Sequence, residues 1–190
     1  MRDKFLNNIV LNSALIASKW AKLVSVSEFT ATYRKVPEEA LIRMGKMSFE
    51  NLGKFLDSQS QRIEIGKFYT DLGILRYNEG YPLCEIHYAL HFTKRVLFNY
   101  ISSEGLLPNT FTLYQANTIT VEINDFFDLA GFYITRGFQE ALYKKLSGVK
   151  GIDKVQIDKI FPKGSFYFER EPEFKTFEKA VESFNIFKVK

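Results

Sequence analysis

The chain has 190 residues and a formal net charge of +4, from 26 lysines and arginines against 22 aspartates and glutamates. A hydrophobic content of 46% is enough to bury a sizeable core, so the composition excludes an intrinsically disordered chain. The basic residues are interleaved with acidic ones, so we expect no nucleic-acid interface, and one cysteine allows neither an internal disulfide nor a cysteine-based zinc site.

The first predicted helix runs from about Asp3 to Leu23. Its apolar residues recur at helical spacing, at Phe5, Ile9, Ile16, Trp20 and Leu23. Polar residues interrupt this stretch every few positions, so it lacks the apolar segment of a signal peptide. Nowhere in the chain does an apolar run approach the ~20 residues that a membrane-spanning helix needs. We therefore expect no membrane segment and a cytoplasmic location.

Two further helices are predicted before residue 80, after a connector at 25–34. Pro37 followed by two glutamates is typical of a helix start, and the apolar pattern continues to about Leu56. The next helix spans about 60–79, where Gly66 and Gly73 lie two turns apart on one side and would let a neighbouring helix approach closely. The residues expected to face inward are Ile65, Phe68, Tyr69, Leu72 and Leu75.

A fourth and a fifth helix follow. Gly80 is suited to end the third helix and Pro82 to open the fourth, which reaches about Ser103. The fifth is predicted from about Asn109 to Leu146. Residues 118–123 alternate like a β-strand, but no partner strand is visible nearby, so we predict helix throughout. At a rise of 1.5 Å per residue this helix would be ~50 Å long.

After residue 147 the pattern becomes irregular, with a short strand predicted at 165–169 and a short helix at 172–184. The fold class is therefore an all-α bundle of five or six helices with a long fifth helix and a short irregular C-terminal segment. A globin-like arrangement is one form that such a bundle takes. We divide the chain into a helical domain at 1–146 and an appendage at 147–190.

The junction of the third and fourth helices carries a family resemblance. The pattern of Arg76, Gly80, Tyr81, Pro82, Leu83 and Glu85, followed by an apolar and basic helix, resembles the N-terminal sensory domain of the RsbT co-antagonist (RsbR-type stressosome) proteins. The similarity extends over roughly 1–146 and includes Asn8, Ile9, Trp20, Tyr33, Arg34, Pro37 and Glu39. It implies an all-α, often dimeric input module of bacterial stress signalling.

The remaining 147–190 segment is too short for the output domain that follows such modules. We therefore expect either a stand-alone sensor or the N-terminal part of a longer protein. The resemblance does not supply a mode of output.

The predicted fourth helix carries the residues best suited to chemistry. Cys84, His87 and His91 share one helix face, with Tyr88 and Arg95 alongside. Two histidines at this spacing are able to bind a metal, and a single one to ligate haem iron. The chain has no other histidine and no HExxH glutamate between these two. We favour a helix–helix or dimer interface, and keep haem or metal at His87 and His91 as the alternative.

Two other constellations have competing interpretations. A Cys84–His87 pair is within helical reach for nucleophilic catalysis, but a lone cysteine in an apolar helix is more often inert, so we expect no enzyme.

The third helix ends in a polar cluster of Arg76, Tyr77 and Glu79. They would either hold a small anion, pair Arg76 with Glu85 across the turn, or form an ordinary helix-end ion pair, which we favour. Arg76 is nevertheless the first residue at which we expect a small ligand.

The sequence thus predicts a non-catalytic signal-input domain. It would detect a small ligand or a regulatory protein partner, relay the change through helix packing, and act as a homodimer without a cofactor. The alternatives are a haem or metal sensor and, less favoured, an enzyme using Cys84 and His87.

Overall fold

A computed structural model describes residues 2–57, 62–107 and 111–161, and every regular element within these ranges is helical. In chain order the helices are α1 (Arg2–Leu11), α2 (Ser13–Val26), the 3-10 helix η1 (Glu28–Lys35), α3 (Glu38–Asp57), α4 (Arg62–Asn78), α5 (Leu83–Ser103), α6 (Leu113–Ser147) and α7 (Lys154–Ile160). The predicted all-α bundle is confirmed.

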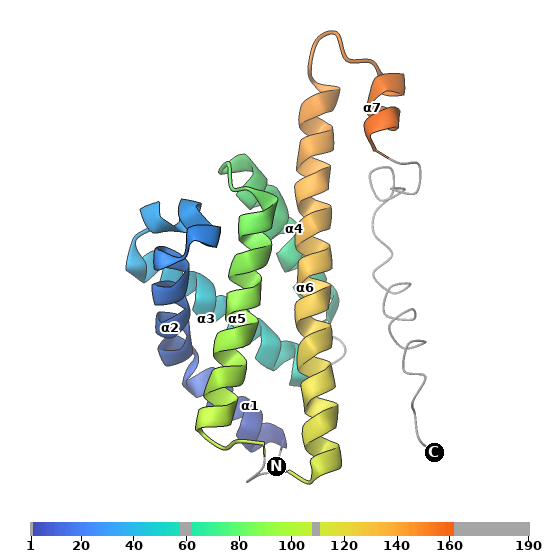
Figure 1. The fold of residues 1–190 in the computed structure, drawn as a ribbon. Helices are drawn as coiled ribbons and strands as arrows, with labels where there is room; N and C mark the ends of the chain where they lie inside the picture. Colours follow the sequence, from blue (N-terminus) through green and yellow to red (C-terminus); the bar gives the residue numbers. More distant parts are fainter. Residues whose placement is uncertain (1, 58–61, 108–110, 162–190) are drawn as a thin grey trace, which may run out of the picture.

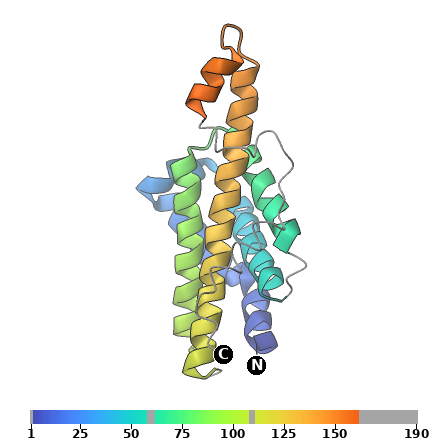
Figure 2. The ribbon, with the colours of Figure 1, turned by 90° about the vertical axis from the view of Figure 1, so that its right-hand side faces the viewer.

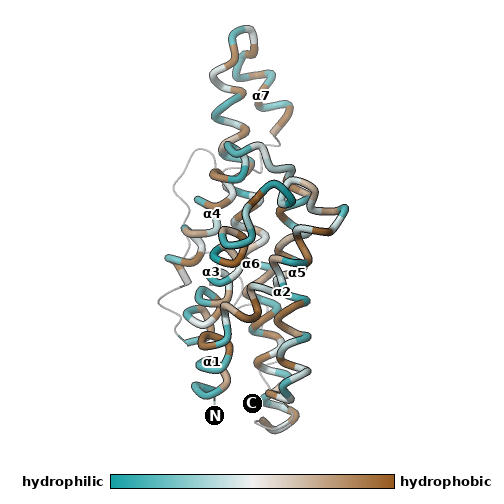
Figure 3. The backbone as a smooth tube through the Cα atoms, turned by 90° about the vertical axis from the view of Figure 1, so that its left-hand side faces the viewer, coloured by the Kyte–Doolittle hydropathy of each residue, from teal (hydrophilic) through white to brown (hydrophobic). Residues whose placement is uncertain are grey.

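Two helix pairs and a central helix make up the bundle. α2 packs against α3 and α4 against α6, while α5 contacts both α2 and α6 (Figure 1). α6 is the longest helix and continues past the ends of its neighbours, where α7 folds back against it (Figure 2). Hydrophobic and hydrophilic positions alternate along the helices, as expected of amphipathic segments around one core (Figure 3).

The predicted first helix is divided at Asn12. α1 and α2 meet at a bend of 55°, and the Asn12 side-chain amide donates to the Asn8 carbonyl at 2.8 Å. Asparagine competes for backbone groups in this way and disfavours a helix interior. The bend still directs Phe5, Ile9 and Ile16 into the core. Among the described residues no single helix is long and apolar enough to cross a membrane, although α1 and α2 together meet that criterion of length and composition.

The predicted connector at 25–34 is instead the 3-10 helix η1. Its position is fixed by Thr30, whose hydroxyl donates to the Val24 carbonyl at 2.8 Å, and by the Thr32 amide, which donates to Glu85 Oε2 at 2.8 Å. The buried ring of Tyr33 packs edge-on against Trp20 and Tyr81. η1 therefore places a tyrosine between α2 and the turn that follows α4.

The turn between α4 and α5 follows the prediction. Gly80 has a φ of +80°, and the amides of Gly80 and Tyr81 donate to the carbonyls of Tyr77 and Arg76 at 3.0 Å. This pattern of bonds is the Schellman motif, for which glycine is preferred because it adopts positive φ without strain. Pro82 then caps α5 in an extended conformation.

α4 and α6 cross with their backbones in contact. A Cβ atom at Gly73 would lie 2.1 Å from the Ile134 carbonyl oxygen, and one at Gly137 would lie 1.9 Å from that of Thr70. The close approach predicted from Gly73 is therefore confirmed. Leu75, in contrast, was wrongly expected to face inward, because 49% of it is exposed at the edge of the bundle.

The C-terminal part differs from the prediction in detail. α6 is helical through 118–123, and it begins at Leu113 behind a capping box of Thr112 and Gln115. α7 was not predicted, although Asp153 and Gln156 form a second capping box at its start. The predicted start at Asn109, the strand at 165–169 and the helix at 172–184 lie outside the described residues, and the division at 146/147 stays a prediction.

Candidate functional site

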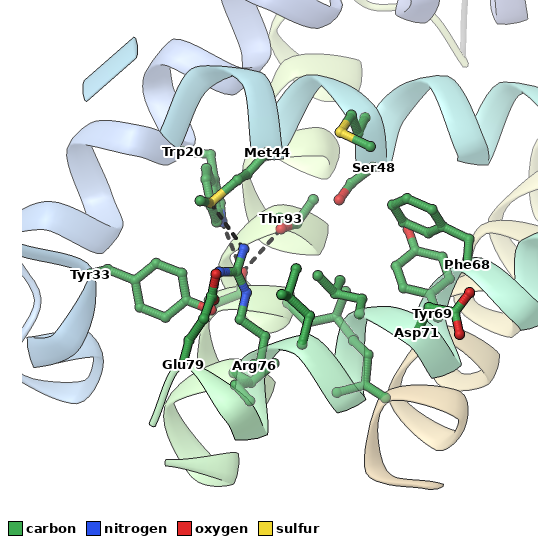
Figure 4. A pocket seen from close by; sticks show the side chains of 17 residues that line it. Trp20, Tyr33, Met44, Ser48, Phe68, Tyr69, Asp71, Arg76, Glu79 and Thr93 are labelled. Carbon is green, nitrogen blue, oxygen red and sulfur yellow. Dashed lines mark hydrogen bonds and ion pairs between the residues drawn. The ribbon is translucent and has the colours of Figure 1, made fainter. Parts of the chain in front are cut away.

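The bundle contains a cavity of about 410 Å³ that is open to solvent and bordered by α2, η1, α3, α4, α5 and α6 (Figure 4). Its wall is mainly apolar, and the side chains that form most of it are Trp20, Phe68, Leu72, Ile86, Leu90 and Ile134. Polar atoms come from a smaller set: Tyr33, Ser48, Tyr69, Asp71, Arg76, Glu79 and Thr93. A mostly apolar cavity with a few convergent polar groups is the usual form of a small-molecule site.

The cavity opens between α3 and α4. Met47 on α3 is 46% exposed and Leu75 on α4 is 49% exposed, and both line the cavity. Two exposed acidic residues also line it, Asp71 on α4 and Glu79 in the turn that directly follows α4. A molecule entering from solvent would therefore pass an acidic and partly apolar mouth.

Arg76 is the buried charge of the cavity. It is 6% exposed and forms an ion pair with Glu79 one turn further along the chain. Its Nη2 donates to Met44 Sδ at 3.2 Å, and its guanidinium carbon lies 4.8 Å from the centre of the Tyr81 ring. The alternative pairing with Glu85 is wrong as a description of this structure, because Glu85 accepts the Thr32 amide. The helix-end ion pair with Glu79 is present, but the guanidinium lies inside the protein.

Three tyrosines around this region stay protonated at neutral pH. Burial raises the pKa of Tyr33, Tyr69 and Tyr81, and the Arg76 charge offsets this only in part at Tyr33 and Tyr81. At Tyr69 the neighbouring Ser48 and Asn51 act against burial, but burial dominates. The hydroxyls therefore act as neutral hydrogen-bonding groups rather than as charges.

Two polar atoms beside the cavity lack a hydrogen bond of normal geometry. They are the Tyr69 hydroxyl and Asn51 Nδ2: Ser48 and Asn51 lie near enough to affect the Tyr69 pKa, but no described residue forms a hydrogen bond of normal geometry with either atom. Buried polar groups are nearly always paired, so such atoms point to a strained position or to a missing ligand. Tyr69 precedes Arg76 on α4 by two helical turns, or ~10 Å along the axis.

The structure brings Cys84, His87, His91 and Arg95 together as an exposed strip along α5. His87 Nε2 lies 2.7 Å from Thr135 Oγ1 of α6, and burial of part of its ring lowers the His87 pKa. None of these four residues lines the cavity.

The two tyrosines predicted with them have packing partners. Tyr88 is half-buried and stacks on Phe29 of η1 at 4.7 Å between ring centres. Tyr77 packs edge-on against Phe138 of α6 at 5.0 Å. Of the seven predicted site residues, Arg76 alone lines the cavity.

Metal and haem binding find little support in this arrangement. In the ranges that the structure describes, no group of three or more histidine, cysteine, aspartate or glutamate side chains is placed to hold a metal ion. His87 and His91 are exposed on α5 and are not among the residues that line the cavity. The haem or metal alternative at His87 and His91 stays a prediction.

Sequence reasoning did not single out Tyr69, Ser48 or Tyr33 as site residues. Tyr69 was expected in the core, and it shares the inward face of α4 with Arg76 because the two are seven residues apart. Polar atoms recurring on an otherwise apolar helix face are the signal that would have identified them.

No protein-family model, no curated protein and no solved structure matches this chain. The resemblance to the sensory domain of RsbT co-antagonist proteins therefore stays a prediction.

Proposed function

We propose that this protein is a non-catalytic signal-input module that binds a small, largely apolar molecule in the cavity and relays binding through α6. The observation that carries the proposal is a cavity of about 410 Å³ in the middle of the bundle, with a buried arginine in its wall. A concave, mainly apolar cavity that is open to solvent and carries a few polar groups is the usual form of a small-molecule site.

Binding is favoured over catalysis by the placement of the reactive side chains. Cys84 is exposed, and neither it nor His87 contributes to the cavity wall. A covalent mechanism needs its nucleophile and base at the place where substrate is held. The cavity instead combines apolar surface with a few hydrogen-bonding groups, which is the composition of a recognition site.

The α4–α6 crossing supports the relay. α4 contributes Arg76 and five further residues to the wall, and its backbone touches that of α6 where Gly73 of α4 and Gly137 of α6 each face the opposite helix. Ile134 of α6 reaches the cavity from the same crossing. A ligand that moves α4 would therefore move α6, since closely packed helices shift as units rather than deform.

Dimerisation belongs to the same proposal. The exposed strip of Cys84, His87, His91 and Arg95 is the surface that we assign to a second copy or to a regulatory protein, as the family resemblance implies. A mass measurement in solution tests this part, and a monomer at all concentrations would contradict the homodimer.

A neutral apolar dye tests binding in the cavity. N-phenyl-1-naphthylamine becomes fluorescent in apolar sites, and we expect saturable binding with one dye per chain. Leu75→Trp should weaken binding by about tenfold or more, because the larger ring at the mouth narrows the entrance. Leu15→Trp makes the same change at an exposed leucine of α2 outside the cavity and should leave binding unchanged. Absence of saturable binding by folded protein would refute the proposal, and equal loss in both variants would place the dye elsewhere.

A further inference from the structure

The ion pair between Arg76 and Glu79 is unevenly buried. The Arg76 side chain is 7% exposed and that of Glu79 is 40% exposed. The positive charge therefore lies within the protein, whereas its counter-charge sits at the mouth and is partly solvated. A buried cation needs a partner, but a half-exposed carboxylate exchanges readily with water or with another anion.

The guanidinium is built to receive a carboxylate. It presents its N–H donors in a planar fork that matches the two oxygens of a carboxylate. One terminal nitrogen bonds Glu79, and the other donates to Met44 Sδ, which is a weak acceptor. An incoming carboxylate could bond both terminal nitrogens at once, taking the place of Glu79 on one and replacing the weak Met44 contact on the other with a charge-assisted bond.

The rest of the cavity lining determines which other groups the ligand can carry. Trp20, Leu72, Leu90 and Ile134 offer apolar contact, and Met44 adapts its shape easily. A single guanidinium balances one negative charge, so a doubly charged phosphate monoester would leave charge unpaired in apolar surroundings. Asp71 and Glu79 at the mouth disfavour anions that lack an apolar portion to offset their repulsion.

We propose that the ligand is a monocarboxylic acid with an apolar tail, and that its carboxylate displaces Glu79 from Arg76. This inference rests on the proposed function of the cavity. Glu79 acts as a placeholder that neutralises Arg76 while the cavity is empty and turns to solvent when the ligand enters. The apolar tail occupies the space between α3, α4 and α5.

Octanoate and octan-1-ol test the ligand class, because they share a tail and differ in charge. In calorimetric titrations octanoate should bind about tenfold or more tightly than octanol, the range expected for a charged hydrogen-bonded pair. Arg76→Met should abolish this preference while octanol still binds. Glu79→Gln should raise octanoate affinity severalfold and leave octanol affinity unchanged, because the competitor for Arg76 loses its charge.

Glu140→Gln is the matched control. Glu140 accepts from the buried Arg136 at 3.2 Å on α6, so the variant makes the same change at another arginine pair, outside the cavity. Octanoate affinity should not change. Equal binding of octanoate and octanol by the unmodified protein would overturn the ligand class and leave the cavity function standing; binding of neither would overturn both. If Arg76→Met fails to fold, Glu79→Gln decides the question. An unchanged octanoate affinity in that variant would overturn the inference and leave the proposed function of the cavity standing.

Discussion

The hydroxyl of Tyr69 is buried in the interior wall of the cavity without a hydrogen bond of normal geometry to any described residue. The ring itself is well packed, edge-on against Phe68 and Phe126 at 5.1 and 5.8 Å. Burying a hydroxyl without a partner costs about 1–3 kcal/mol. The unpaired hydroxyl thus destabilises the empty protein.

Tyr69→Phe should therefore raise the free energy of unfolding by about 1 kcal/mol at neutral pH, measured by urea denaturation. The pH dependence gives a second readout. Because burial raises the Tyr69 pKa, the unfolded chain loses this proton first, and stability falls as the pH rises through 10. In Tyr69→Phe this alkaline decline should be shallower, and the decline that remains is due to Tyr33, Tyr81 and Tyr100, whose pKa values are also raised by burial.

Tyr114→Phe is the control, because Tyr114 is 73% exposed on α6 and should change neither readout. A loss of stability in Tyr69→Phe would mean that Ser48 or Asn51 forms a hydrogen bond with the Tyr69 hydroxyl, which would contradict the claim that this hydroxyl is unpaired.

For single residues, helical spacing predicted which side chains share a helix face, but it did not predict whether that face is buried or exposed. Cys84, His87 and His91 do lie together on α5, yet the spacing is equally compatible with a buried and an exposed strip. Arg76 was identified because an arginine beside a Gly-Tyr-Pro turn stands out in the sequence. Leu75 was misplaced because the buried stripe of α4 runs through Tyr69, Gly73 and Arg76, and Leu75 lies at its edge, one position before Arg76.

Among the elements, the crossing of α4 and α6 depends most closely on individual residues. Gly73 and Gly137 each face a carbonyl oxygen of the opposite helix, so the two backbones touch on both sides of the contact. A backbone atom is unable to rotate away as a flexible side chain does. Any side chain here has to separate the helices.

Gly73→Ala should therefore lower the free energy of unfolding by about 3 kcal/mol, the upper end of the usual cost of overpacking. Gly131→Ala on α6 is the matched control, because its new methyl group would meet His87 Cε1 at an ordinary contact distance of 3.4 Å. It should be neutral or stabilise by up to ~1 kcal/mol through helix propensity. Chemical denaturation of both variants measures the difference, and equal effects would contradict close backbone packing at Gly73.

The long helices followed from periodicity and punctuation. Pro37 and the Gly80–Pro82 turn placed the ends of α3, α4 and α5 within a few residues. The break at Asn12 was missed because the apolar spacing continues across it, from Ile9 to Ile16, and a bend that keeps both helices on the core leaves no gap in the pattern. η1 and α7 were missed because one or two turns carry too few residues for a period.

For the whole molecule, the cavity is a property that no single segment of the sequence encodes. It exists because side chains from six elements leave space between them, and small residues such as Ser48, Ala89 and Thr93 stand where larger ones would have filled it. The same arrangement makes α4 the link between the cavity and α6, whose C-terminal part extends beyond the bundle (Figure 1).

Ligand binding should consequently slow amide hydrogen exchange in α4, which lines the cavity, and also in residues 140–147 of α6, which do not. Tight packing at Gly73 and Gly137 transmits the loss of mobility along α6. α1 contributes nothing to the wall and serves as the internal reference, so its exchange should slow less than that of α4 and of residues 140–147. Mass spectrometry with and without saturating octanol measures this. Slowing confined to the lining residues would contradict the relay, and equal slowing in α1 would indicate global stabilisation instead, because ligands that bind only the folded state slow exchange throughout by suppressing complete unfolding.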